Sequence, residues 1–391
     1  MPLGSALEAL IDHRGKTPKK LGGDWSATGH RVVSALNIKN STVDDNEHHY
    51  ISDDLYENWM KIKLQAGDVI LTSEAPTGEV AYLAHDYDWA LGQRVFGLRG
   101  KKDVLDGRFL YYALRGGDLR HNLMSRTTGT TVQGIRQAEL VKVEINLPPL
   151  PEQRAIAATL GALDDKIESN RRQRHLLREF GLAEYHASIG DGSRSLQLSA
   201  ATVSIARGVA PKYADEDLDA ALVINQKCIR DGWVSLAPAR RMHDRTVKPE
   251  KRASAGDILV NSTGTGTLGR IARWHAGEIF VDGHVSVVKA DRSVISPTVL
   301  AYSLLRREAD IEGLATGSTG QTELSAARLG ELNVILPPTE QGSGLETTLI
   351  AIENRCDQLA AENTNLESTR DALLPALLSG SIRVPAEGVE A

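Results

Sequence analysis

At 391 residues the chain is long enough for two or more domains, each with its own core. Charged residues make up 25% and hydrophobic residues 41%, as in ordinary soluble globular proteins, and the net charge of −6 argues mildly against nucleic-acid binding as a property of the whole chain. No apolar run approaches the ~18–20 residues that span a bilayer, no secretory apolar core is present, and the only cysteines are Cys228 and Cys356, so we expect a cytoplasmic protein without a disulfide framework.

Residues 1–146 are predicted to form one mixed α/β domain. A basic turn from Arg14 to Lys20 lies near its start, and Asn37-Ile38-Lys39 is typical of the end of a short strand. Gly-Asp followed by a β-branched run indicates a buried strand. The expected elements are a short helix over 2–11, strands near 67–73, 79–83 and 93–98, a helix over 109–114 and an open polar loop over 128–133.

A proline-rich stretch separates this domain from a long helix. The residue before a proline is pushed out of the helical region, whereas a proline in the first turn of a helix costs nothing. Pro148, Pro149 and Pro151 therefore predict the end of one domain and the start of a helix. Beyond them, apolar residues recur at coiled-coil spacing around one polar residue. The predicted seam residues are Ile156, Leu160, Leu163, Ile167 and Asn170.

The second half of the chain repeats the first half. The basic turn recurs at 207–212, the strand ending at 225–227 and the polar loop at 316–321. A second Pro-Pro-x-x-Glu-Gln opens another heptad run, although Gly342-Ser343-Gly344 is expected to delay the start of that helix. Its predicted seam residues are Leu349, Ile352, Cys356, Leu359, Asn363 and Leu366.

The sequence therefore predicts an α+β protein with two tandem α/β domains related by a pseudo-two-fold axis. Each domain is followed by a long helix, and the two helices are expected to pair as an antiparallel coiled coil. The predicted parts are a first domain over 1–146, a spacer helix over 147–189, a second domain over 190–335, a second spacer helix over 336–384 and a loose tail over 385–391.

Several motifs that suggest catalysis lack the residues that the chemistry needs. An amino-methyltransferase box requires a hydrogen-bond acceptor side chain just before Pro-Pro, which holds the exocyclic amine of the flipped base. In this chain Leu147 and Leu336 occupy that position and cannot accept a hydrogen bond through their side chains. Gly15-Lys16-Thr17 is no P-loop, because a leucine replaces the first glycine. The glycine-rich run 262–269 is better explained as a tight turn than as a cofactor loop, and His48-His49 has no metal-ligand spacing. We expect no active site, no metal and no cofactor bound by this chain.

Binding signals recur in both halves. Arg and Lys neutralise phosphates, while Asn and Gln can pair with adenine edges, so the basic turns, strand endings and Thr/Gly/Gln loops predict a DNA-binding role. For any single residue, a solvated turn remains the alternative. The candidate DNA-binding residues are Arg14, Lys16, Thr17, Lys19, Lys20, Asn37, Lys39, Ser73, Arg94, Thr128, Thr130, Thr131, Gln133, Arg136, Arg207, Lys212, Asn225, Lys227, Ser262, Thr316, Ser318, Thr319 and Gln321.

Five strings resemble specificity (S) subunits of type I restriction–modification systems, and the resemblance covers essentially the whole chain. They are Glu74-Ala75-Pro76, Gln93-Arg94, the run from Thr128 to Gln137, Pro148-Pro149-Leu150-Pro151-Glu152-Gln153 and the run from Leu366 to Gly380. The second domain departs from the pattern because it lacks the Glu-Ala-Pro string.

The resemblance implies two target-recognition domains, each reading half of a bipartite, asymmetric sequence in double-stranded DNA. It also implies that the helix pair sets the spacer length and docks two modification subunits. Those partners would carry S-adenosylmethionine and adenine-N6 methylation, and restriction subunits would add ATP- and Mg-dependent translocation and cleavage. The chain itself would be non-catalytic. A self-sufficient DNA adenine methyltransferase and a coiled-coil scaffold that does not bind DNA remain as alternatives.

Overall fold

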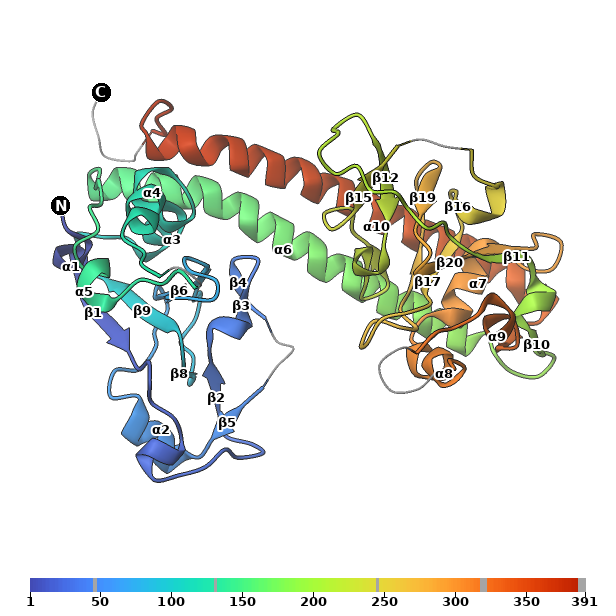
Figure 1. Cartoon of the computed structure of the whole chain (residues 1–391), viewed down its shortest axis with the longest axis horizontal. Helices are drawn as coiled ribbons and strands as arrows, with labels where there is room; N and C mark the ends of the chain where they lie inside the picture. Colours follow the sequence, from blue (N-terminus) through green and yellow to red (C-terminus); the bar gives the residue numbers. More distant parts are fainter. Residues whose placement is uncertain (45–47, 130–131, 244–245, 317–321, 386–391) are drawn as a thin grey trace. The chain divides into compact units, whose positions relative to one another are not determined.

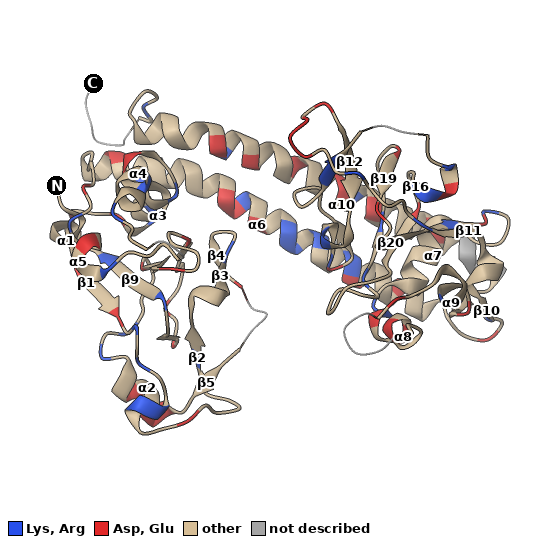
Figure 2. Ribbon diagram, in the orientation of Figure 1, with Lys and Arg blue, Asp and Glu red and all other residues tan. Residues whose placement is uncertain are grey.

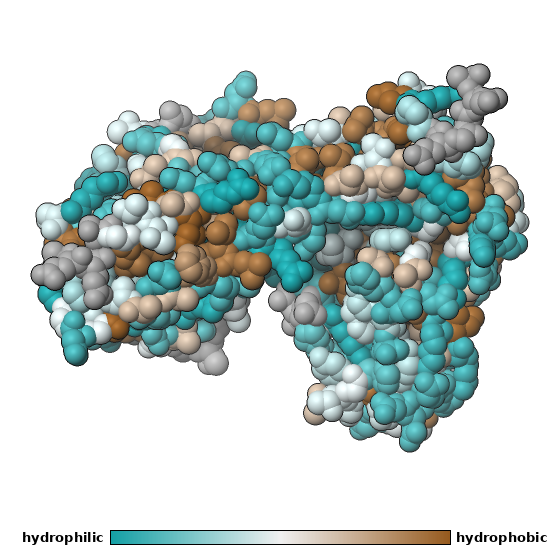
Figure 3. Space-filling model, turned by 180° about the vertical axis from the view of Figure 1, so that it is seen from behind, coloured by the Kyte–Doolittle hydropathy of each residue, from teal (hydrophilic) through white to brown (hydrophobic). Residues whose placement is uncertain are grey.

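Figure 1 shows the computed structural model of the chain, which describes residues 1–44, 48–129, 132–243, 246–316 and 322–385. In these ranges no helix combines the length and the apolar composition that crossing a bilayer requires. On the face drawn in Figure 3, hydrophilic residues cover most of the surface, and hydrophobic residues form smaller groups.

The chain divides into two compact units, each of which has its own core. The first contains Met1–Ser169 and Glu362–Ala391, and the second contains Asn170–Ala361. Both boundaries lie inside the long helices α6 (Leu150–Ala187) and α10 (Thr339–Leu378). Each unit therefore holds one portion of each long helix.

The first unit combines three small sheets, one of them the two-stranded pair β3–β4, with short helices. Its strands are β1 (Leu7–Asp12), β2 (His30–Val33), β3 (Ile38–Lys39), β4 (Thr42–Val43), β5 (Tyr50–Ile51), β6 (Val69–Thr72), β7 (Val80–Tyr82), β8 (Ala90–Leu91) and β9 (Val95–Gly100). Its short helices are α1 (Leu3–Ala6), α2 (Asp53–Trp59), α3 (Gly107–Arg115), α4 (Gly117–Ser125) and α5 (Gln137–Leu140). An antiparallel sheet in the order β1-β9-β6-β7 packs against α3, and a second sheet has the order β5-β2-β8.

The amino-terminal segment differs from the prediction. The helix expected over 2–11 ends at Ala6, and the chain continues as strand β1. Because β1 pairs with β9, a partner far along the chain outweighs the local helical pattern. The same segment also reaches the end of the domain, since the amino group of Met1 donates to the Ile145 carbonyl at 2.9 Å.

The second unit repeats this architecture. Its strands are β10 (Arg194–Gln197), β11 (Thr202–Arg207), β12 (Ala221–Ile224), β13 (Ile229–Arg230), β14 (Trp233–Val234), β15 (Arg240–Met242), β16 (Arg252–Ala253), β17 (Ile258–Asn261), β18 (Ile271–Arg273), β19 (Ile279–Val281), β20 (Val285–Ala290) and β21 (Asn333–Leu336). Its short helices are α7 (Pro297–Leu304), α8 (Glu308–Gly313) and α9 (Ala326–Gly330). The sheet order β11-β20-β17-β18 matches β1-β9-β6-β7, and β10 pairs with β21 where the domain begins and ends.

The matching strands give the duplication a residue register. Asp12 lies opposite Phe96 in the pair β1–β9. Arg207 lies opposite Ser286 in the equivalent pair β11–β20. Arg207 therefore corresponds to Asp12, and the predicted match of Arg207 with Arg14 is wrong.

A second match is also shifted. Asn225 caps the 3-10 turn over Gln226–Cys228 in the same way that Ser34 caps the turn over Ala35–Asn37. Asn37 therefore corresponds to Cys228, and its predicted match with Asn225 is wrong by three residues. Hydrogen-bond geometry, and not the similarity of Asn-Ile-Lys to Asn-Gln-Lys, sets the alignment.

Helices α6 and α10 lie side by side and run antiparallel (Figure 1). In the first unit, Arg370 of α10 donates to Asp164 of α6 at 2.7 Å. In the second unit, Arg178 of α6 lies 3.0 Å from Glu353 of α10. Residue numbers thus rise along one helix as they fall along the other, which confirms the predicted antiparallel pairing.

Most of the predicted seam residues are buried. Ile156, Leu160, Ile167, Asn170, Leu349, Ile352, Cys356, Leu359 and Asn363 are buried, while Leu163 and Leu366 are half-buried. One polar contact crosses the apolar seam in the first unit, since Asn363 Nδ2 donates to the Ile167 carbonyl at 3.3 Å.

The starts of the two long helices also differ from each other. Helix α6 begins after Pro149, and the buried Gln153 fastens it to the first domain by donating to the Val104 carbonyl at 3.0 Å. Helix α10 begins at Thr339 and continues through Gly342-Ser343-Gly344, so the predicted delay is wrong. A glycine costs a helix only about 1 kcal/mol, which the burial of Leu345 and Leu349 can offset.

Candidate nucleic-acid interface

Four segments of the first unit surround an open hollow of about 630 Å³, which we call the first hollow. They are residues 14–15, 73–74, 93–94 and, in the fourth segment, 128–129, 132 and 134–136. The frame is made of backbone bonds at the end of β6: Ser73 N donates to the Arg94 carbonyl at 2.8 Å, and Ile135 N donates to the Ser73 carbonyl at 2.9 Å. Thr77 Oγ1 adds a bond to the Gln133 carbonyl at 2.6 Å. Gln133, at the end of the predicted polar loop, and Ile135 just after it are therefore fastened to the segment that follows the buried strand β6.

Cationic side chains line the first hollow. Arg14 donates to both carboxylate oxygens of Asp12, at 2.8 Å each, and lies over the Phe96 ring at 4.1 Å. Arg94 is 51% exposed and lies 3.3 Å from Glu74, which is 45% exposed. Arg14 is thus held by the fold, whereas Arg94 keeps most of its donors accessible.

The second unit forms an equivalent hollow of about 430 Å³, the second hollow. It is lined by Arg207, Gln226, Thr263, Gly264, Thr265, His284, Thr322 and Glu323. Ser262 N donates to the His284 carbonyl at 2.8 Å, and Leu324 N donates to the Ser262 carbonyl at 2.9 Å, so the frame is the same. The run over 262–269 connects the antiparallel strands β17 and β18, as expected for a turn.

The side chains of the second hollow are chemically different. Thr263 Oγ1 lies 2.7 Å from His284 Nδ1 and donates to Gln226 Oε1 at 3.2 Å. Arg207 forms an ion pair with Glu323, which neutralises its charge locally. Thr263 and His284 therefore lie in the second hollow where Glu74 and Arg94 lie in the first.

Burial shifts the pKa of one titratable group near each hollow, His13 in the first unit and Asp282 in the second. Desolvation, followed by the charge of Lys16, lowers the pKa of His13 beside the basic turn, so its imidazole is neutral at pH 7. Burial raises the pKa of Asp282 next to His284, although the backbone N–H of His284 donates to its carboxylate at 2.8 Å and opposes the shift.

The structure brings five of the candidate residues together in the first hollow: Arg14, Ser73, Arg94, Thr128 and Arg136. Lys16 and Thr17 line a neighbouring hollow of about 310 Å³ that shares Arg94. Among the candidates of the second unit that the structure describes, Arg207 alone lines the second hollow, with Ser262 buried at the strand end and Thr316 bridged to Glu323. The exposed candidates that line neither the first nor the second hollow are Lys19, Lys20, Lys39, Gln133, Lys212 and Lys227. Thr130, Thr131, Ser318, Thr319 and Gln321 lie outside the described residues.

Two predicted base-reading amides are used inside the domains. Asn37 Oδ1 accepts from the Ser34 backbone at 2.9 Å, and Asn225 Nδ2 donates to the Pro238 carbonyl at 2.7 Å. Both side chains are buried. They therefore hold turns in place, and Asn37 also lines the neighbouring hollow that contains Lys16 and Thr17.

The candidate list omitted several residues that line the hollows, namely Glu74, Gln93, Gln226, Thr263, His284 and Glu323. Each of these residues follows a buried strand or belongs to a loop bridged to one, so a position just after a strand is what they share. Residue type alone favours Lys and Arg and does not indicate such positions.

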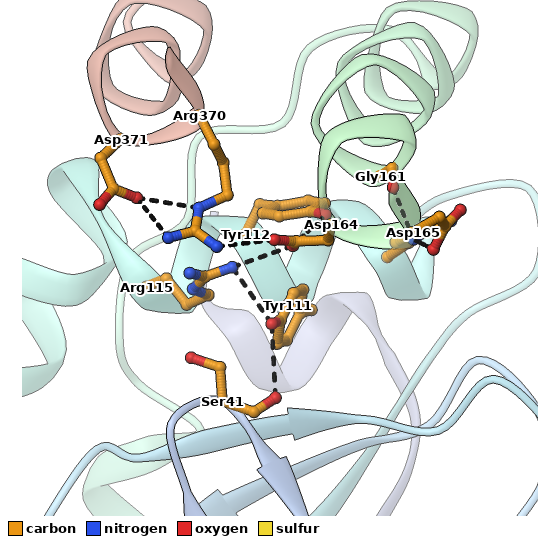
Figure 4. A network of polar contacts seen from close by, with 10 residues as sticks. Ser41, Tyr111, Tyr112, Arg115, Gly161, Asp164, Asp165, Arg370 and Asp371 are labelled. Carbon is orange, nitrogen blue, oxygen red and sulfur yellow. Dashed lines mark hydrogen bonds and ion pairs between the residues drawn. The ribbon is translucent and has the colours of Figure 1, made fainter. Parts of the chain in front are cut away.

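One carboxylate ties each domain to both long helices within its own unit; Asp164 is half-buried and Glu353 is buried. In the first unit, Asp164 of α6 accepts from Tyr112 at 2.7 Å, from Arg115 at 3.2 Å and from Arg370 of α10 at 2.7 Å (Figure 4). We call this group the Asp164 cluster. Burial and the adjacent carboxylate both raise the pKa of Tyr112.

The second unit contains a matching Glu353 cluster. Glu353 of α10 accepts from Tyr302 at 2.8 Å and from Arg273 at 3.0 Å, and it pairs with Arg178 of α6. The tyrosines come from the equivalent helices α3 and α7. In each unit the carboxylate comes from the long helix that directly follows the domain in the chain.

Comparisons with known proteins agree with this architecture. The family described as type I restriction modification DNA specificity domain matches residues 3–178. The chain is 23% identical over 382 residues to a protein described as the specificity subunit of the type I restriction enzyme MjaX of Methanocaldococcus jannaschii, covering 91% of this chain and 88% of that protein. It is 19% identical over 381 residues to the StySPI specificity subunit of Salmonella potsdam, covering 90% and 81%.

A solved structure extends the likeness to the fold. The crystal structure of the type I restriction–modification system S subunit from M. genitalium matches with a TM-score of 0.58 and 19% identity, covering 96% of this chain and 95% of that one. Residues 3–178 thus match the specificity-domain family of type I restriction–modification systems, and the duplicated sheets and the antiparallel helix pair have the fold of an S subunit.

Proposed function

We propose that this chain is the sequence-recognition subunit of a type I restriction–modification complex, with residues 1–146 and 190–335 each reading one half of a bipartite, asymmetric DNA target. The observation that carries the proposal is the duplicated hollow, in which one backbone frame presents two different sets of side chains. Two different reading surfaces on one frame suit a target whose halves differ in sequence.

Local charge has to supply the affinity for DNA. Lys and Arg are interspersed with Asp and Glu in both units (Figure 2), so neither unit carries charges of a single sign. Arg14, Arg94 and Arg136 around the first hollow are the proposed phosphate and base contacts there. Binding is then expected to weaken steeply with salt, as counterion release requires.

The long helices, over 147–189 and 336–384, are proposed to set the distance between the half-sites. About thirty paired residues at 1.5 Å each span roughly 45 Å, on the order of a dozen base pairs. Antiparallel pairing and the Asp164 and Glu353 clusters support this role, because they fix each domain to both helices. The same pair is proposed to dock two modification subunits, and restriction subunits would join them in a complete complex.

The chemistry is assigned to those partners. S-adenosylmethionine, ATP and Mg are expected on them and not on this chain, which would act in the cytoplasm as a non-catalytic subunit. Titration calorimetry of the chain alone with S-adenosylmethionine is expected to give no heat of binding. Saturable binding would instead make the chain a methyltransferase in its own right.

Methylome sequencing tests the central proposal. The chain is expressed with a modification subunit from the same system in cells free of other adenine methyltransferases. A split motif with two specific halves and a fixed unspecified gap is expected. Methylation of a continuous motif, or methylation that does not depend on this chain, would contradict the proposed function.

A further inference from the structure

We propose that Glu74 and Arg94 form the base-reading pair of the first domain and select a G·C base pair in one half of the DNA target. The inference rests on the proposed function and adds to it the identity of one recognised base pair. It also identifies Thr263 and His284 as the corresponding pair of the second domain.

The equivalence of the two pairs comes from backbone bonds. Arg94 and His284 each accept, through the carbonyl, from the serine that follows the central strand, Ser73 or Ser262, at 2.8 Å. Glu74 is bridged to Gly134 in the loop after the α3–α4 pair, and Thr263 is bridged to Glu323 in the same way. The pairs therefore occupy the same two positions of one frame.

The side chains at these positions touch in both domains but differ in chemistry. Arg94 lies 3.3 Å from Glu74, and His284 Nδ1 lies 2.7 Å from Thr263 Oγ1. A pair with only a structural role would keep its chemistry when the frame is duplicated. The backbone therefore holds two contacting side chains in the same positions in both domains, while the chemical groups of these side chains differ. Two half-sites of different sequence require such an arrangement, because each base pair presents its own donors and acceptors.

The charges of the first pair complement a G·C pair. In the major groove, guanine presents two acceptors, N7 and O6, which a guanidinium can bind with two donors, and cytosine presents an N4 amino donor, which a carboxylate accepts. An A·T pair would place the N6 donor of adenine against Arg94 and the O4 acceptor of thymine against Glu74. Both mismatches leave charged groups unsatisfied, so the pair rejects A·T as well as binding G·C.

The frame limits how far this pair can move. Arg94 has a φ of +64°, a left-handed conformation that few non-glycine residues adopt. Gly134 leaves little space beside Glu74, because a Cβ at Gly134 would lie 3.2 Å from the Cβ of Glu74. A fixed backbone on both sides makes the pair suited to reading a base edge, which needs orientation as well as charge.

A phosphate contact is the rival role for Arg94, and the two roles predict different results. Loss of a phosphate contact weakens binding to all sequences alike, whereas loss of a base contact relaxes the motif at one position. The assembled complex is therefore compared, by methylome sequencing, between the wild type and the variants Arg94→Ala, Arg94→Lys and Glu74→Ala. Arg136→Ala is the control, because Arg136 lines the same hollow as an exposed cation.

The wild type is expected to show a split motif with a G·C pair in one half. Arg94→Ala and Glu74→Ala should reduce discrimination at that position about tenfold or more, leaving the other half unchanged. Arg94→Lys should keep methylation while weakening the preference, since lysine retains the charge without the paired donors. Thr263→Ala with His284→Ala should relax the other half. Arg136→Ala should lower methylation without changing the motif.

Three outcomes would overturn the inference while leaving the proposed function intact. They are an unchanged motif in Arg94→Ala, a uniform fall in methylation with the motif retained, and a relaxed position occupied by A·T in the wild type. Absence of any split motif in the wild type would instead remove the proposed function and this inference together. Thermal melting of each variant separates loss of contact from loss of fold.

Discussion

Asp164 of α6 and Arg370 of α10 are joined by a hydrogen-bonded ion pair of 2.7 Å, although they lie 206 residues apart in the chain. Tyr112 and Arg115 of α3 bind the same carboxylate. One side chain thus connects the two long helices and the first domain, so a change there should affect all three elements at once.

Replacing Asp164 with alanine is expected to lower the free energy of unfolding by about 2–3 kcal/mol, because two arginines lose a charged partner and Tyr112 loses its acceptor. Asp165→Ala is the matched control. Asp165 is 67% exposed and pairs with Arg108, so its loss should cost less than about 1 kcal/mol. Urea denaturation followed by circular dichroism measures both, and equal losses would contradict the role of the Asp164 cluster.

Asn363 is predicted to hold the register of the helix pair. Asn363→Leu should leave stability unchanged or slightly higher, because an amide is replaced by an apolar side chain in a buried seam. It should also allow a second gap length to appear in the methylated motif. Leu359→Ala, expected to cost about 2–5 kcal/mol with no change in gap, is the control. A single unchanged gap in Asn363→Leu would refute a register role.

Helix length is predicted to set the gap of the target. Adding one heptad to each helix lengthens the pair by about 10 Å, or roughly three base pairs. Methylome sequencing should show a longer gap between two unaltered half-sites. Changed half-sites would mean that the helices also take part in reading bases.

Both cysteines are predicted to be unreactive in the folded chain. Burial raises the pKa of Cys228 and raises that of Cys356 to about 11, so both remain thiols at pH 8. A disulfide reagent such as dithionitrobenzoate should label neither cysteine until denaturant is added, and then label both. Rapid labelling of the native chain would contradict this burial.

Asp282 is predicted to make the free energy of unfolding depend on pH, with a sign that follows from its raised pKa. Its folded-state pKa is raised, chiefly by burial, so the folded chain holds this proton more tightly than the unfolded chain does. The contribution of Asp282 to stability is therefore present below the unfolded pKa of ~3.9 and is lost as pH rises through the folded pKa. The stability of Asp282→Asn relative to wild type should rise over that window and then level off. Denaturation at a series of pH values measures the difference, and a falling difference would contradict the burial argument.

The parts of the fold that could be predicted from sequence are those encoded by local spacing. Heptad positions such as Leu160 and Leu359 predict the helix pair, and repeated strings predict two domains of one fold. Residue register could not be predicted, because Arg207 resembles Arg14 in sequence but occupies the position of Asp12 in the sheet. Strand β1 and the start of α10 depend on tertiary packing that local propensity does not include.

The candidate site was only partly predictable for a related reason. The arginines of the basic turn and of Gln93-Arg94 are visible as charges, and they do line one hollow. Glu74 and Arg94, however, become a pair only when β6 and β9 lie side by side, and no sequence spacing specifies that contact. Asn37 has a suitable side chain for reading bases but is used to cap a turn.

Each domain starts and finishes at one place. Met1 bonds Ile145 in the first domain, and Arg194 pairs with Leu336 in the second, so the chain leaves each domain beside the point where it entered. An inserted domain would need to match its host at only two neighbouring backbone positions. Recombination could therefore exchange a whole domain in a single event, with the two long helices left as they were.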